Sequence, residues 1–172
     1  MMKYARLSPL FVLLLAISTL WLGGCTAAGQ MTLPNSRPGD FTLGVVVYGT
    51  EDAGAVETRS ARYIIDADGY LRASVGAGSS PSTYPKITRR LDAAQLDQIW
   101  DLVHRLMLGG DPGSGAGWTS VLPAGERMGP GGPGYLIEIR SDDLVGAWSG
   151  SIDLAGGEEL VATLAGLAWI RE

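Results

Sequence analysis

Apolar residues recur at helical spacing in two segments of the chain. In residues 92–108, Asp92 can cap a helix, and Gln95 three residues later completes a capping box. One apolar stripe runs along this segment and consists of Leu96, Ile99, Trp100, Val103, Leu106 and Met107. A second stripe follows in residues 158–170, where Glu158 and Glu159 near its start complement the helix dipole. The pattern predicts two amphipathic helices.

Short runs of β-branched and aromatic residues predict strands elsewhere in the chain. Residues 41–48 form the first run. Residues 62–66 and 70–75 flank an Asp-Gly pair, which favours a hairpin because glycine accepts the positive φ of a tight turn. Residues 135–140 and 144–149 form a second hairpin. These elements predict an α+β fold: an antiparallel sheet of about five to six strands, two hairpins plus an N-terminal strand, with both helices packed on one face. Each hairpin leads to a helix, and a single sequence leaves open whether the two halves are a duplication.

A stretch rich in glycine and proline separates the first helix from the second hairpin. Residues 109–134 contain ten glycines and four prolines, and within them only residues 118–122 are typical of a strand. A loop of this length inside a compact domain is usually either functional or disordered. This stretch is therefore the first place to look for a partner-binding segment.

The tryptophans divide into core candidates and binding candidates. Trp100 and Trp169 fall on the predicted helices, where core packing accounts for them. Trp118 lies in the long loop and Trp148 in the second hairpin, and exposed aromatics can anchor a partner. Together with Arg127 in the loop they are the candidate partner-binding residues. The alternative for Trp118 is that its ring covers the edge of the core.

The N-terminus has the pattern of a secretory signal. Lys3 and Arg6 precede an apolar run over residues 10–22, which is shorter than the roughly 20 residues that span a membrane. The following Leu22-Gly23-Gly24-Cys25 resembles the bacterial lipobox. This resemblance implies cleavage before Cys25 and attachment of lipid to its thiol. The alternative is an ordinary signal peptide, or an uncleaved N-terminal helix, in which Cys25 is incidental.

Three parts follow from this pattern. Residues 1–24 are the expected signal peptide, and residues 25–40 are the lipidated cysteine and a flexible tether, since they are small, polar and interrupted by prolines. Residues 41–172 are the expected single α+β domain. Two or three acyl chains hold a protein stably at a membrane. By resemblance to lipoprotein sorting, Thr26 in place of aspartate favours the outer membrane, facing the periplasm, if the host is Gram-negative.

Composition and charge narrow the choice of partners. The chain is 46% apolar and 18% charged, which suits a globular domain with a core. Removing Lys3 and Arg6 with the signal leaves 11 of the 13 basic side chains against 18 acidic ones, a net charge of −7. Such a charge repels phosphate backbones and anionic headgroups, so a nucleic-acid partner is not expected. Membrane attachment then depends on the lipid at Cys25, and the expected partner is an envelope protein or the cell wall.

Few residues are arranged for catalysis or metal binding. With one histidine and one cysteine, no metal site or cofactor is expected. His104 shares the polar side of the first helix with Asp101, and a solvated face is favoured there over a general base. Residues 66–69 (DADG) resemble the start of a calcium loop, but glycine comes fourth rather than sixth, which favours a hairpin turn. The expected function is a non-catalytic binding module, with a carboxylate-based hydrolase less favoured.

One family resemblance concerns the second half of the chain. From Ile87 onward come a capped helix, a variable loop, a hairpin that opens with Tyr135-Leu136-Ile137-Glu138-Ile139, and a short terminal helix. This layout resembles the emfourin family of small metalloprotease inhibitors, over about half of the chain. The resemblance implies an alternative function, the inhibition of a secreted metalloprotease. No inhibitory residue can be carried over to this sequence.

Overall fold

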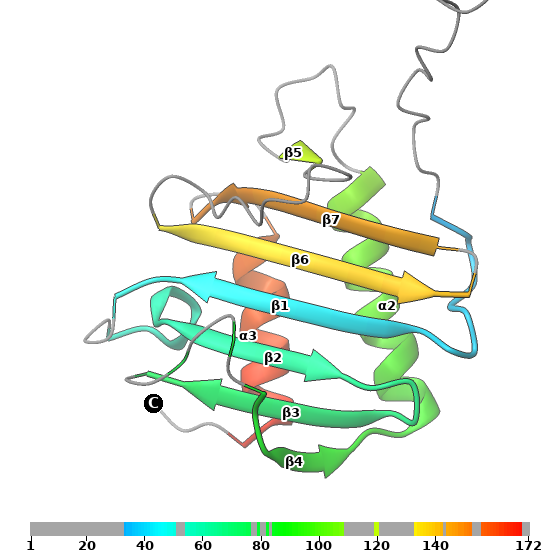
Figure 1. Cartoon of the computed structure of the whole chain (residues 1–172), viewed down its shortest axis with the longest axis horizontal. Coiled ribbons are helices and arrows are strands. Elements are labelled where there is room, and N and C mark those ends of the chain that lie inside the picture. The colour runs from blue at the N-terminus through cyan, green and yellow to red at the C-terminus, as the bar shows by residue number, and fades with distance from the viewer. Residues whose placement is uncertain are drawn as a thin grey trace, which may run out of the picture. The chain divides into compact units, whose positions relative to one another are not determined.

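The computed structural model places one compact unit from Leu33 onward (Figure 1). The described residues are 33–50, 54–76, 79, 82, 84–108, 119–120, 133–142, 144–152 and 156–169. The strands are β1 (Thr42–Tyr48), β2 (Ala61–Ile65), β3 (Tyr70–Val75), β4 (Ile87–Arg90), β5 (Thr119–Ser120), β6 (Gly134–Ser141) and β7 (Leu144–Ser151). The helices are the 3-10 turn η1 (Val56–Thr58), α2 (Ala93–Leu108) and α3 (Gly157–Leu167).

All named strands join one sheet, in the order β4-β3-β2-β1-β6-β7-β5. Every pairing between them is antiparallel, and six of the strands have four to eight residues, while β5 adds two residues at one edge. Both long helices lie behind the sheet, on the same face (Figure 1). The predicted α+β architecture is therefore confirmed.

The first helix begins as its capping signals predict. The backbone N–H of Asp92 donates to Gln95 Oε1 at 3.1 Å, and the N–H of Gln95 donates to Asp92 Oδ1 at 2.9 Å. These two bonds satisfy donors that the first turn of a helix leaves without partners. The predicted hairpin turn at residues 66–69 is also confirmed, with Gly69 at φ 79° and its N–H bonded to Asp66 O at 2.8 Å.

The core fills the space between the helices and one side of the sheet. Alternate strand positions supply it, because successive side chains of a strand point to opposite faces. In β1 these are Leu43, Val45 and Val47, which are all buried. Trp100 of α2 lies among them with 2% of its surface exposed, and its ring meets Phe41 edge-on at a centroid distance of 5.0 Å. Core packing of Trp100 is therefore confirmed.

The compact unit begins earlier in the chain than the predicted domain boundary at residue 41. The side chain of Leu33 is only 5% exposed and belongs to the core. Arg37 Nε forms an ion pair with Asp97 Oδ1 of α2 at 2.8 Å. Residues 33–40 thus pack on the domain through the buried side chain of Leu33 and the ion pair of Arg37. The predicted signal peptide and Cys25 lie outside the described residues.

Two further expectations differ from the structure at the ends of elements. The sequence pattern contains no prediction for β4, whose residues are half-buried or exposed and lack an apolar alternation. The last helix ends at Leu167 rather than Ile170, and Trp169 has φ 56° and is 64% exposed. Core packing was therefore the wrong explanation for Trp169. A left-handed residue cannot continue a helix, so its ring leaves the apolar stripe.

Tyr63 of β2 provides a test of the core at alkaline pH. Its side chain is 1% exposed, and its hydroxyl has no hydrogen-bond partner among the described residues. Burial, and then the charge of Glu57, raise the pKa of Tyr63 well above its ordinary value of 10.0. The folded state therefore excludes the phenolate, while the unfolded chain forms it freely, so stability present below about pH 10 is lost as the pH rises further.

We expect Tyr63→Phe to keep the wild-type free energy of unfolding at neutral pH, because the hydroxyl that it removes has no partner. Between about pH 9 and pH 11 the variant should lose less stability than the wild type, since it has no buried phenol to ionise. Urea unfolding followed by circular dichroism measures both effects. Tyr70→Phe, at a half-buried tyrosine outside the core, is the control, and equal alkaline losses in Tyr63→Phe and the wild type would contradict the prediction.

Candidate functional site

The sheet face opposite the helices carries a cluster of arginine and tyrosine side chains near β4. We call this cluster the Arg–Tyr patch, and it consists of Asp66, Tyr70, Arg72, Tyr84 and Arg90. Tyr70 and Arg72 occupy alternate positions of β3, and Arg90 is the register partner of Tyr70 on β4. Because the core side chains of these strands point to the helices, the patch faces away from them.

Asp66 organises one half of the Arg–Tyr patch. Its Oδ2 accepts a hydrogen bond from Arg72 Nε at 2.7 Å, and its Oδ1 accepts one from the Tyr84 hydroxyl at 3.0 Å. The Arg72 guanidinium also lies over the Tyr84 ring, with Cζ 4.5 Å from the centroid. The hydrogen bond to Asp66 raises the pKa of Tyr84 and that of Arg72. The hydrogen bond and the ring contact together hold Tyr84 against Asp66 and Arg72 on the surface.

Arg90 forms the second half of the Arg–Tyr patch with Tyr70. Its Cζ lies 5.6 Å from the centroid of the Tyr70 ring. Arg90 is exposed, and it forms no ion pair within the part of the chain that the structure describes. A guanidinium that rests on an aromatic ring keeps its N–H groups available to an incoming carboxylate.

A third cation–aromatic pair lies on the other side of β4. Arg89 points to the helix side, where its Cζ is 4.7 Å from the centroid of the Trp169 ring, and its Nη1 donates to Leu167 O at 3.5 Å. The described residues expose four large hydrophobic side chains, and three of them lie in β4 or beside it: Tyr84 at 63%, Ile87 at 50% and Trp169 at 64%. Aromatic and arginine side chains of this kind are enriched where proteins bind partners.

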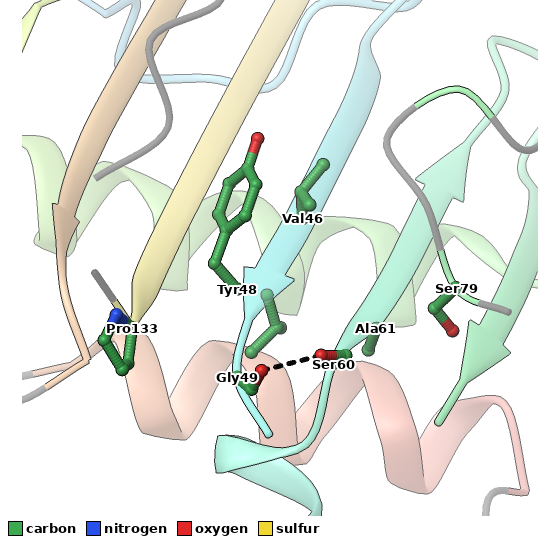
Figure 2. Close-up of a pocket in the computed structure, with 8 residues that line it drawn as sticks. Val46, Tyr48, Gly49, Ser60, Ala61, Ser79 and Pro133 are labelled. Atoms are coloured by element: carbon green, nitrogen blue, oxygen red, sulfur yellow. Dashed lines mark hydrogen bonds between the residues drawn. The ribbon is translucent and has the colours of Figure 1, made fainter. Parts of the chain in front are cut away.

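A small pocket lies at the end of β1, apart from the patch (Figure 2). Its volume is about 280 Å³, and it is lined by Val46, Val47, Tyr48, Gly49, Ser60, Ala61, Ser79 and Pro133. Ser60 Oγ donates to Gly49 O at 2.8 Å, which ties the start of β2 to the end of β1. This lining contains no carboxylate, cationic or imidazole side chain. Its polar side-chain groups are the hydroxyls of Tyr48, Ser60 and Ser79.

Of the residues predicted from sequence to bind a partner, the structure describes only Trp148. Cys25, Trp118 and Arg127 lie outside the described residues. Trp148 of β7 faces the helix side and packs against the core, with its ring over Gly146, where a Cβ atom would overlap it. β7 and β4 are near opposite ends of the sheet order, so Trp148 is not part of the Arg–Tyr patch. Its role in binding stays a prediction.

His104 is less exposed than a solvated helix face implies. It is half-buried, its Nε2 is covered and has no hydrogen-bond partner among the described residues, and its ring centroid lies 6.3 Å from that of Trp100. Residues four apart share one side of a helix, so the large indole covers part of the imidazole. The neighbouring Asp101 and Arg105 on the predicted solvated face are exposed, whereas His104 itself is half-buried.

The Arg–Tyr patch was missed by the reasoning from sequence, although a local signal was present. Lys86-Ile87-Thr88-Arg89-Arg90 is a basic run just before a capped helix, and Tyr70 and Arg72 alternate with apolar residues. Neither run matches the residue spacing of a binding motif. Their juxtaposition depends on the β3–β4 register, which includes a bulge between Leu71 and Arg72.

Comparison of this chain with protein-family models, with curated proteins and with solved structures finds no match. Within the described ranges, no three or more His, Cys, Asp or Glu side chains are grouped to hold a metal ion. No helix in those ranges is long and apolar enough to cross a membrane. Function is therefore inferred from the residues of this chain and from their geometry.

Proposed function

We propose that this chain is a lipid-anchored lipoprotein of the bacterial cell envelope whose α+β domain is a non-catalytic binding module. The observation that carries the binding role is the group of three cation–aromatic pairs around one sheet edge: Arg72–Tyr84, Arg90–Tyr70 and Arg89–Trp169. The anchor is supported by the lipobox-like residues 22–25, with the only cysteine of the chain at the position that receives lipid. The partner is an envelope protein or the cell wall.

The lipid anchor determines where in the envelope the domain can meet a partner. The anchor keeps the domain at a membrane surface, where two or three acyl chains give stable attachment. The β4 side then meets partners within reach of that surface. In a Gram-negative host this is the periplasmic side of the outer membrane. No metal, cofactor or nucleic acid enters the proposed activity.

Site-specific photo-crosslinking in living cells tests the binding half. A photoreactive benzoylphenylalanine replaces Ile87, which is 50% exposed beside the Arg–Tyr patch. The matched control is the same replacement of Val145 on β7, which is 49% exposed. We expect a discrete crosslinked species at position 87 that is absent at position 145. Identical patterns at the two positions, or no adduct at position 87, would contradict binding through the β4 side.

The second candidate function is inhibition of a secreted metalloprotease. The element order behind the emfourin resemblance is present as a capped α2, the β6–β7 hairpin and α3. Incubating the full-length protein with secreted metalloproteases encoded near its gene tests this candidate. A loss of protease activity that follows the inhibitor concentration favours it, and unchanged activity with every protease tested rules it out.

A further inference from the structure

We infer that β4 is a docking edge for an extended acidic segment of a partner protein, which joins the sheet as an additional strand. This inference rests on the proposed binding function and names the chemistry of the partner. We use the term β4 edge for residues 84–91 together with Trp169. Its backbone, its charge and its exposed aromatic side chains each support the inference.

Among the described residues, the backbone of β4 pairs with another strand on one side only. β4 ends the sheet order of these residues, and its partner there is β3. The N–H of Leu91 donates to Gly69 O at 2.8 Å, and Arg90 pairs in register with Tyr70. Because hydrogen bonding alternates along an antiparallel strand, the N–H and C=O of Arg90 point away from β3. Such outward groups are the ones that an added strand uses.

The charge of the β4 edge is opposite to that of the whole protein. Residues 84–91 contain Lys86, Arg89 and Arg90 and no acidic side chain, whereas the chain carries a net charge of −5. Of the acids near the ends of the strand, Asp66 already accepts bonds from Arg72 and Tyr84. Asp92 caps α2, and Asp68 lies in the β2–β3 turn. An acidic strand in register with residues 86–90 would therefore meet cations.

A second copy of this chain is a poor occupant of the same edge. Pairing two β4 strands would bring Arg89 and Arg90 of one copy close to the same cations of the other, and like charges across a strand pair are destabilising. Cations on an edge strand are a common protection against pairing between copies. The same cations favour a strand that carries Glu or Asp.

Exposed side chains supply an apolar contact on both faces of the β4 edge. Ile87 of β4 and Tyr84 just before the strand are exposed, and Trp169 lies on the helix side of β4 against Arg89. Trp169 has φ 56°, a conformation that bulky residues rarely adopt and that costs about 1–2 kcal/mol. Backbone strain of this kind gathers at functional positions. In our inference it holds the indole at the strand edge, where an added strand would cover it.

Peptide binding to the full-length protein in a neutral detergent tests the inference. The probes are two labelled ten-residue peptides, one alternating Glu and Val and the other alternating Lys and Val. Fluorescence anisotropy should show binding of the Glu peptide only, and binding should weaken as salt rises from about 50 to 300 mM because exposed charges are screened. Hydrogen exchange should slow at the Arg90 amide when the Glu peptide is bound.

Variants separate strand addition from simple charge attraction. Arg90→Ala removes the charge and keeps the N–H, whereas Arg90→Pro also removes an outward N–H, which an edge strand tolerates. We expect Arg90→Pro to weaken binding of the Glu peptide roughly tenfold more than Arg90→Ala does, since blocking an edge N–H blocks the added strand. Arg105→Ala removes an exposed cation from the far end of α2 and should leave binding unchanged (Figure 1).

Equal affinities of Arg90→Ala and Arg90→Pro would overturn strand addition, and equal binding of the Glu and Lys peptides would overturn the acidic partner. The melting temperature of Arg90→Pro shows whether it is folded. If it is not, Trp169→Ala decides between the outcomes: weaker binding of the Glu peptide supports the inference, and unchanged affinity overturns it. If the Glu peptide does not bind but the crosslink at position 87 forms, strand addition is wrong and the proposed binding module is retained. If the crosslink at position 87 is also absent, the proposed function is wrong as well.

Discussion

Replacing Trp100 with alanine should lower the free energy of unfolding by about 3–5 kcal/mol, the range for truncating a large core aromatic. The indole is 2% exposed and packs edge-on against Phe41, so α2 loses this aromatic contact with the residue that precedes β1. Trp100 Nε1 has no hydrogen-bond partner among the described residues, so the loss comes from the cavity and not from a broken bond. Urea unfolding followed by circular dichroism measures it.

Two other tryptophans make a matched series with Trp100. Trp148 is half-buried at the margin of the core, and Trp169 is 64% exposed with the Arg89 guanidinium over its ring. The cost of alanine substitution should therefore fall in the order Trp100, Trp148, Trp169, with the last near 1 kcal/mol or below because an exposed cation–π pair contributes about 0.5–1 kcal/mol. A cost for Trp169→Ala equal to that for Trp100→Ala would show that burial does not control the series.

The elements predicted correctly from sequence are those with complete local signals. The Asp92 and Gln95 capping box marks the start of α2, and the Asp-Gly pair marks the β2–β3 turn. Both signals act within four residues, so no knowledge of distant contacts is needed. The two helical stripes also placed both helices on one face, because a sheet with one apolar face offers them a single side to cover.

The β4 edge could not be predicted in the same way. β4 has one neighbouring strand, so its side chains are not buried and the alternation of apolar and polar residues that marks a strand is missing. Trp169 follows an apolar helical pattern, but its backbone turns into the left-handed region after Leu167. The Trp169 ring then lies against Arg89, which is a contact between residues 80 positions apart.

The Arg–Tyr patch also could not be predicted from the sequence. Asp66, Arg72 and Tyr84 are spread over 19 positions, and no motif links them. They meet because the β2–β3 hairpin places Asp66 and Arg72 on one face, and the chain before β4 returns Tyr84 over the Arg72 guanidinium. The net charge of the whole chain is negative, so it gave no indication of the basic residues at the β4 edge.

The proposed anchor gives the prediction with the largest effect on location. Cys25→Ser should move the protein from the membrane fraction to the soluble fraction of the envelope, because a hydroxyl does not receive the lipid that the lipobox-like residues 22–25 imply. Fractionation followed by mass spectrometry of the N-terminus measures this change. The wild type should begin at Cys25 with attached lipid, and the variant should carry none.

Thr26→Ser is the matched control, since it makes a change of similar size next to the cut and leaves the thiol in place. It should stay in the membrane fraction. The compact unit begins at Leu33, so Cys25→Ser should also unfold at the same urea concentration as the wild type. A variant that remains at the membrane with normal folding would show that something other than lipid on Cys25 holds it there. Release together with unchanged stability would show that the lipid on Cys25 determines location and does not contribute to folding. Partner specificity would then depend on the domain, where we infer that the β4 edge binds the partner.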